Sequence, residues 1–221
     1  MRIASKLERI SLGLEPKSKY YIVPEGDKTE IQYFCGIRDN AEELQIKSLI
    51  EIIPIENDED EYGQSHPKEK INNFNKDVEE GKFTFDREID KVCFIVDRDP
   101  QNFSEDQLNE FIKKCEINKY NIYLSNPTFE IFLIMHDDIV LELDKKKMLE
   151  NKRQTRRGKR FLERKLSEVF GCSKVNLNFE KFKPNIKKAI KNEKNFCEDL
   201  EELKNKLGSN VGKLLDSIIE N

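Results

Sequence analysis

Dense apolar runs alternate with helical patterns through the first half of the chain. Buried-type strands are predicted at 19–26, 44–56, 90–100 and 120–127. Helices are predicted between them at 28–39, 66–80 and 104–115. The last of these helices begins at Ser104, and Gln107 three residues later completes the pattern of a capping box. Strands that alternate with helices form βαβ units, so the pattern predicts an α/β fold with a mainly parallel sheet of four strands.

The pattern becomes helical throughout after Pro127. Helices are predicted at 127–136, 144–170, 184–206 and 210–220. No Pro/Gly/Ser-rich linker and no repeat separates this part from the first half, so we expect the helical half to pack on the sheet. The expected division is an α/β core at 1–143 and a helical region at 144–221, with a single domain as the alternative.

The amino-acid composition is typical of a folded, highly charged protein. Of the 221 residues 37% are charged, and the 37% that are hydrophobic gather in runs that disordered chains lack. The first ten residues are polar, and no apolar run approaches the roughly 18 residues of a membrane span. Five cysteines without a C-x-x-C pair suggest neither a disulfide framework nor a zinc site. We therefore expect a cytoplasmic protein without a membrane partner.

Positive charge is concentrated in one region, although the net charge is −4. Between Lys145 and Lys194 the chain has 18 Lys or Arg against 5 Asp or Glu. Within the predicted helix 144–170, one stripe at helical spacing is formed by Arg153, Arg156, Arg157, Arg160 and Arg164. Such a stripe is either a solvated face or a surface that binds the backbone of DNA or RNA.

Three carboxylates stand at predicted strand ends. Glu25 ends the first strand, and Asp97 and Asp99 end the third. In the strand order 2-1-3-4 these two strands are neighbours, and ligands of parallel α/β sheets bind at the carboxyl ends of the strands. Carboxylates brought together repel one another unless a cation lies between them, and an all-oxygen cluster selects Mg²⁺ or Mn²⁺. Acidic residues at strand ends are also common without a metal, so structural carboxylates are the alternative.

The segment "SNPTFEIFLIMH" predicts a buried helix, with Asn126 as its cap and Pro127 in its first turn. Glu130 lies in that turn, and a buried carboxylate needs a partner or a metal. We expect an ion pair with Lys28 or Arg98, and a direct catalytic role for Glu130 is the alternative. His136, at the far end, is expected to be a core histidine.

Four motifs together resemble the RloB-like family, which includes AbiL-type abortive-infection components. They are "EGDKTE" from Glu25, "VDRD" from Val96, "SNPTFEIFLIMH" from Ser125 and "GSNVGKLLDSI" from Gly208. The resemblance implies a Toprim-like fold in which Glu25 is a metal ligand or general acid/base and Asp97 and Asp99 form the metal-binding pair. It also implies an AAA/ABC-type ATPase partner and a role in phage defence.

The resulting expectation is a metal-dependent nuclease for DNA or RNA, with Lys28 and Glu130 beside the three predicted metal ligands. The alternative is a non-catalytic adaptor that docks the ATPase through its basic helix. A topoisomerase or primase is less well supported, because the extra domains of those enzymes are missing from this sequence. "GSNVGKL" is not a P-loop, since it has three residues between its glycines and no Ser or Thr after Lys213.

Overall fold

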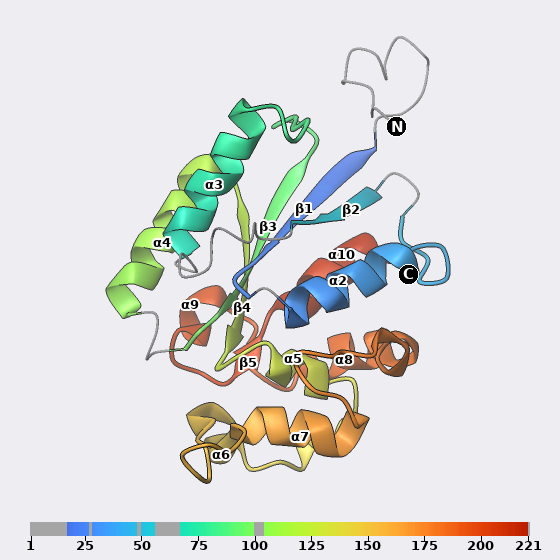
Figure 1. Cartoon of the computed structure of the whole chain (residues 1–221), viewed down its shortest axis with the longest axis vertical. Coiled ribbons are helices and arrows are strands. Elements are labelled where there is room, and N and C mark those ends of the chain that lie inside the picture. The colour runs from blue at the N-terminus through green and yellow to red at the C-terminus, as the bar shows by residue number, and fades with distance from the viewer. Residues whose placement is uncertain (1–16, 27, 48–49, 56–66, 100–103, 221) are drawn as a thin grey trace.

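The computed structural model describes residues 17–26, 28–47, 50–55, 67–99 and 104–220. These residues contain one five-stranded sheet in the order β2-β1-β3-β4-β5 (Figure 1). Its strands are β1 (Ser18–Pro24), β2 (Ile50–Pro54), β3 (Lys91–Asp97), β4 (Asn121–Asn126) and β5 (Gly208–Ser209). The first four are parallel, and β5 pairs antiparallel with β4. The predicted order of the four parallel strands is confirmed, and the fifth strand was not predicted.

Helices lie on both faces of the sheet and beyond one of its edges. They are α2 (Thr29–Asp39), α3 (Pro67–Glu79), α4 (Glu105–Asn118), α5 (Glu130–Ile134), α6 (Lys145–Glu150), α7 (Phe161–Phe170), α8 (Ile186–Glu193), α9 (Leu200–Leu203) and α10 (Val211–Ile218). Figure 1 shows α3 and α4 on one face, α2 and α10 on the other, and α5, α6 and α7 beyond the carboxyl ends of the strands. None of the described helices could cross a membrane, because none is long and apolar enough.

The two faces of the sheet enclose two separate cores. Successive side chains of a strand point to opposite faces, and in β1 Tyr20 and Ile22 join one core while Tyr21 and Val23 join the other. All four are almost fully buried, as expected for a parallel sheet covered on both sides. The larger core also contains Phe182. Residues on both sides of position 143 therefore share one core.

The prediction of one helix over 144–170 is wrong. Helix α6 ends at Glu150, and Asn151 takes a left-handed conformation with φ 40° that closes it. The Asn151 side chain then accepts a hydrogen bond from the amide of Leu162, with 3.0 Å between Oδ1 and N. One asparagine therefore ends α6 and anchors the start of α7, and the residues between the two helices form a connecting segment.

The predicted arginine stripe does not exist as a helical face. Arg153, Arg156 and Arg157 are exposed on the connecting segment, Arg160 directly precedes α7, and Arg164 lies within α7. An isolated antiparallel bridge joins residues 153 and 160. The positive charges are therefore presented by a loop whose two ends lie close together.

Three other predicted elements differ from the structure. Helix α5 begins later than predicted, at Glu130, and the Asn126 side chain donates to the carbonyl of Leu203 instead of capping the helix. The Asn126–Pro127 peptide bond is cis. The predicted helix 184–206 is divided into α8 and α9. In the predicted strand 44–56 the paired strand begins only at Ile50, after Ile46 has made an isolated bridge with Ile219.

Candidate functional site

Hydrogen bonds tie together the carboxyl ends of β1 and β3 and the start of α5. The amide of Glu25 donates to the carbonyl of Ile95 at 2.8 Å, which continues the pairing of β1 with β3. Oε2 of Glu25 accepts from the amide of Asp97 at 2.8 Å, and Oδ1 of Asp97 accepts from the amide of Phe129 at 2.8 Å. Two of the three predicted metal ligands therefore lie side by side at the sheet edge, held by backbone donors.

Glu30 is a further carboxylate at this edge. It lies in the first turn of α2 and is only 6% exposed. Its Oε2 packs over Gly26, where a Cβ atom would come within 2.7 Å. The glycine of the E-G turn therefore leaves the space that the Glu30 carboxylate occupies.

The carboxylates at this edge repel one another. Burial raises the pKa of Glu25 to about 7, and the negative charge of Asp99 adds to the rise. Burial also raises the pKa of Glu30 to about 7, followed by the charges of Glu130 and Glu25. The pKa of Asp97 is raised well above its ordinary value by burial and then by Glu30, Glu25 and Glu130. The edge thus concentrates negative charge in a poorly solvated place.

Two lysines that the sequence analysis did not select offset part of this charge. Lys70, in the first turns of α3, is buried, and its charge lowers the pKa values of Glu25 and Glu30. Lys174 pairs with Glu163 at 2.5 Å, and the charge of Glu130 contributes to its raised pKa. Lys70 could have been selected from its position in the sequence. It lies in the first turns of a helix that follows a parallel strand, and such turns lie at the same edge of the sheet as the strand ends.

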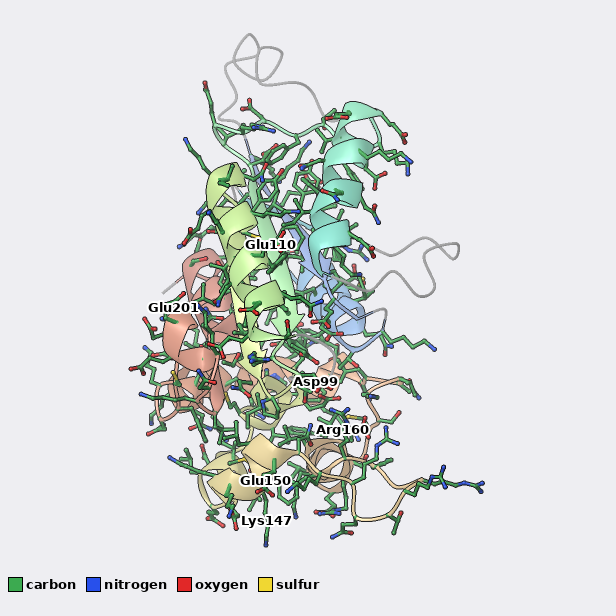
Figure 2. All side chains as sticks on the ribbon, turned by 90° about the vertical axis from the view of Figure 1, so that its left-hand side faces the viewer. Asp99, Glu110, Lys147, Glu150, Arg160 and Glu201 are labelled. Atoms are coloured by element: carbon green, nitrogen blue, oxygen red, sulfur yellow. The ribbon has the colours of Figure 1, made fainter. Side chains whose placement is uncertain are left out.

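Asp99 is held by an arginine from the other half of the chain. Nη1 of Arg160 lies 2.8 Å from Oδ2 of Asp99, and Figure 2 shows the two side chains next to each other. The amide of Arg160 donates to Oε2 of Glu163 at 3.0 Å, which completes a capping arrangement at the start of α7. Of the five predicted nucleic-acid-binding arginines, Arg160 is thus brought directly to a predicted metal ligand.

Among the described residues, the other four arginines make no ion pair or hydrogen bond with the carboxylates at the strand ends. Arg164 pairs with Glu168 at 3.4 Å and lies over the ring of Phe161, with 5.4 Å from Cζ to the centroid. Arg156 and Arg157 are exposed.

The expected partners of Glu130 lie elsewhere. Glu130 is buried, but Lys28 is exposed on the turn before α2 and makes no ion pair with it in the described part of the chain. Nε of Arg98 donates to the carbonyl of Lys204 at 2.9 Å, so this side chain extends toward α9. The predicted ion pair of Glu130 with Lys28 is therefore wrong. Arg98 connects the end of β3 to the C-terminal region.

His136 belongs to the core, as predicted. It is fully buried, and its Nε2 lies 3.0 Å from the hydroxyl of Tyr33. Its Nδ1 faces the carbonyls of Phe132 and Leu133 at 3.2 and 3.1 Å, so Nδ1 carries the proton and Nε2 accepts from the tyrosine. Burial lowers the pKa of His136 to about 4. A neutral, fully bonded histidine is a structural element here.

The carboxylate oxygens at the sheet edge are ligands of the kind that a hard divalent cation prefers. The carboxylates supply only oxygen, and their mutual repulsion would be relieved by a cation between them. In the present side-chain positions, however, no three His, Cys, Asp or Glu side chains of the described residues form a group that could hold a metal ion. Binding would require Glu25, Asp97 or Asp99 to reorient.

Comparison with known proteins identifies the family. No curated protein and no solved structure shows significant similarity to the chain. The family model described as RloB-like protein matches residues 20–218, which is nearly the whole chain. The motifs at Glu25, Asp97 and Glu130 all fall within the matched residues, and the chain belongs to the RloB-like family.

Proposed function

We propose that this protein is a Mg²⁺-dependent nuclease with a Toprim-like core that hydrolyses phosphodiesters of DNA or RNA. One observation carries the proposal: Glu25, Glu30, Asp97 and Glu130 meet at the carboxyl edge of a parallel sheet. Burial and the neighbouring carboxylates Glu25 and Glu130 raise the pKa values of both Glu30 and Asp97 there. Structural carboxylates are usually paired with cations, whereas the four carboxylates of this group outnumber the two lysines, Lys70 and Lys174, that offset part of their charge. A site that attracts a divalent cation explains the excess.

Glu25, Asp97 and Asp99 would hold Mg²⁺ or Mn²⁺. A carboxylate has two oxygens, so the ligand oxygen of Glu25 or Asp97 need not be the one that accepts the backbone hydrogen bond. When bound, the ion would orient a phosphodiester, activate water and offset charge on the leaving oxygen. As the alternative to ligating the ion, Glu25 could move a proton at neutral pH, because burial raises its pKa to about 7 in the metal-free protein.

Glu130, Lys28 and the basic segment have supporting roles in the proposal. Glu130 adds negative charge beside Asp97, and Lys28 is exposed at the mouth of the same turn, where a substrate phosphate could reach it. The connecting segment between α6 and α7 contains six Lys or Arg and no Asp or Glu from 152 to 160. A basic segment beside the carboxylates is suited to bind a nucleic-acid backbone without reading its sequence.

The family resemblance supports two further parts of the proposal. We place the protein in anti-phage defence, together with an AAA/ABC-type ATPase encoded nearby. The nuclease would be the effector, and the ATPase would supply the nucleotide-dependent control.

A cleavage assay tests the nuclease directly. Purified protein, alone and with its ATPase partner, is incubated with Mg²⁺ and with single- and double-stranded DNA and RNA. We expect cleavage that Glu25→Gln and Asp97→Asn reduce by at least about 100-fold, as removal of acid–base groups typically does. Glu110→Gln is the matched control, because Glu110 is exposed on α4, far from Asp99 (Figure 2). Uncut substrates under all conditions, or equal activity of all variants, would refute the proposal.

A non-catalytic adaptor is the second candidate. It is favoured by the hydrogen bonds that Glu25, Asp97 and Asp99 already make within the protein, and by the exposure of Arg156 and Arg157. An adaptor would retain phage defence in Asp97→Asn and lose it when both exposed arginines are changed to Glu. A nuclease would lose defence in Asp97→Asn.

A further inference from the structure

A pocket lies between the end of β3 and the basic connecting segment. Its volume is about 470 Å³, and its lining includes Asp99 and Pro127 on the sheet side and Leu149, Arg153 and Arg160 on the helical side. Figure 2 shows Asp99 and Arg160 between the sheet and the region of α6. Leu149 is 37% exposed, so part of its side chain is open to the pocket. The pocket thus combines an apolar wall with three cationic side chains and two carboxylates, because Lys152 and Glu150 also line it and pair with each other at 3.1 Å.

The Arg160 side chain is placed so that it can change partners. Its backbone is fixed by the hydrogen bond to Glu163, yet its side chain is 25% exposed and reaches Asp99 across the pocket. The Asp99 side chain is 11% exposed, so this ion pair is partly shielded from water. While Arg160 occupies Oδ2 of Asp99, that oxygen is not available to a cation.

We propose that the pocket binds a phosphodiester-linked nucleotide of the substrate strand, and that Arg160 moves from Asp99 to a phosphate of this nucleotide. This inference rests on the proposed nuclease function. The planar guanidinium matches phosphate as well as carboxylate, so the exchange keeps Arg160 paired. Asp99 is released at the same time for a divalent cation, so each charge gains a new partner. Pro127 and Leu149 provide an apolar surface for the sugar or base.

The exchange makes metal and substrate binding cooperative. A phosphate that takes Arg160 removes a competitor of the metal, and a metal that takes Asp99 releases Arg160 for the phosphate. The two effects must be equal, because coupling between binding sites is reciprocal. Without substrate, the Arg160–Asp99 ion pair therefore keeps the affinity for metal low.

Mn²⁺ binding, measured by the electron paramagnetic resonance signal of the free ion, tests the exchange. The probe is a single-stranded phosphorothioate oligonucleotide, as DNA and as 2′-O-methyl RNA, which remains uncut. In the wild-type protein we expect one of these probes to tighten Mn²⁺ binding by at least about fivefold. In Arg160→Gln we expect tighter Mn²⁺ binding without the oligonucleotide, and no further effect when it is added.

Two other variants keep the test independent of folding and of catalysis. Asp99→Asn breaks the ion pair from the other side, and it should bind the oligonucleotide more tightly than the wild type when metal is absent. Arg87→Gln, at an exposed arginine before β3, should keep the wild-type coupling.

The outcomes separate this inference from the proposed function. A protein that cleaves nucleic acid but shows unchanged coupling in Arg160→Gln, or no tighter oligonucleotide binding in Asp99→Asn, overturns the exchange alone. A protein that neither binds Mn²⁺ nor cleaves overturns both.

Discussion

The Glu25 carboxylate accepts a hydrogen bond from the backbone amide of Asp97, with 2.8 Å between Oε2 and N. This bond joins the ends of β1 and β3 and places two carboxylates at one edge of the sheet. Their mutual repulsion is a cost to the folded protein that a bound cation would remove. Removing one of the carboxylates, or adding a divalent cation, should therefore change the free energy of unfolding.

Asp97→Asn should stabilise the metal-free protein and abolish its response to metal. Asparagine keeps an oxygen that accepts from the amide of Phe129 and removes one repelling charge, so we expect the free energy of unfolding to rise by about 1 kcal/mol. Wild-type protein should gain about 2.7 kcal/mol at Mg²⁺ concentrations 100 times the dissociation constant. Urea titrations with and without Mg²⁺ measure both quantities. Equal stabilisation of wild type and variant by Mg²⁺ would show that Asp97 is not a ligand.

Gly26→Ala should act through Glu30. A Cβ at position 26 would lie 2.7 Å from Oε2 of Glu30, so the carboxylate must move, at a cost of about 1–2 kcal/mol. Adding Glu30→Ala removes the clashing group, and the double variant should recover most of the cost caused by alanine at 26. A double-mutant cycle in thermal or urea unfolding measures this coupling. Additive effects of the two changes would contradict the packing of Glu30 over Gly26.

Stability should fall as the pH rises from about 4.5 to about 8 because of Glu193. This buried carboxylate accepts from the amide of Gly212 at 2.9 Å through Oε1, and its Oε2 has no hydrogen-bond partner among the described residues. Burial raises its pKa to about 8. The unfolded chain releases this proton near pH 4.5 and the folded chain only near pH 8, so stability decreases as pH rises between these values.

Glu193→Gln should remove this pH dependence. We expect the variant to exceed the wild type by roughly 3–5 kcal/mol above pH 8 and to match it near pH 4.5. Urea unfolding from pH 5 to 9 measures the difference, with Glu201→Gln, at an exposed side chain of α9, as the control. Parallel curves for wild type and Glu193→Gln would mean that Glu193 ionises normally.

Exposed arginines of the connecting segment should determine the salt dependence of nucleic-acid binding. Each phosphate contact contributes about 0.7–0.9 to the slope of log K against log salt concentration. Replacing both Arg156 and Arg157 by Gln should therefore reduce the slope by about 1.5 and weaken binding equally for all sequences. Fluorescence anisotropy at several salt concentrations gives the slopes. An unchanged slope would assign nucleic-acid binding, if present, to another surface.

Much of the sheet was predictable because its signals are local. Strands β1 and β3 are runs of apolar residues, and Ser104 with Gln107 forms the capping box that the spacing indicated. Once the order of the parallel strands is known, the carboxyl edge and its residues Glu25 and Asp97 follow from topology. The meeting of these two carboxylates was predictable for that reason.

The connecting segment was not predictable because its determinants are tertiary. Lys, Arg and Gln favour helices, so residues 152–160 continue the pattern of α6 in the sequence. The helix ends where Asn151 turns into the left-handed region and bonds to Leu162, and Arg160 leaves the helical path to reach Asp99. The bond between Asn151 and Leu162 spans 11 positions and the contact between Arg160 and Asp99 spans 61, and helix propensity carries no information about either.

We propose above that Glu25, Asp97 and Asp99 hold a divalent cation. A crystal soaked in Mn²⁺ and measured near the manganese absorption edge tests it most directly. We expect an anomalous peak within about 2.0–2.4 Å of oxygens from these side chains, with Arg160 displaced from Asp99 when an oligonucleotide is also present. The absence of a peak at saturating Mn²⁺, with the three carboxylates still bonded as described, would contradict it.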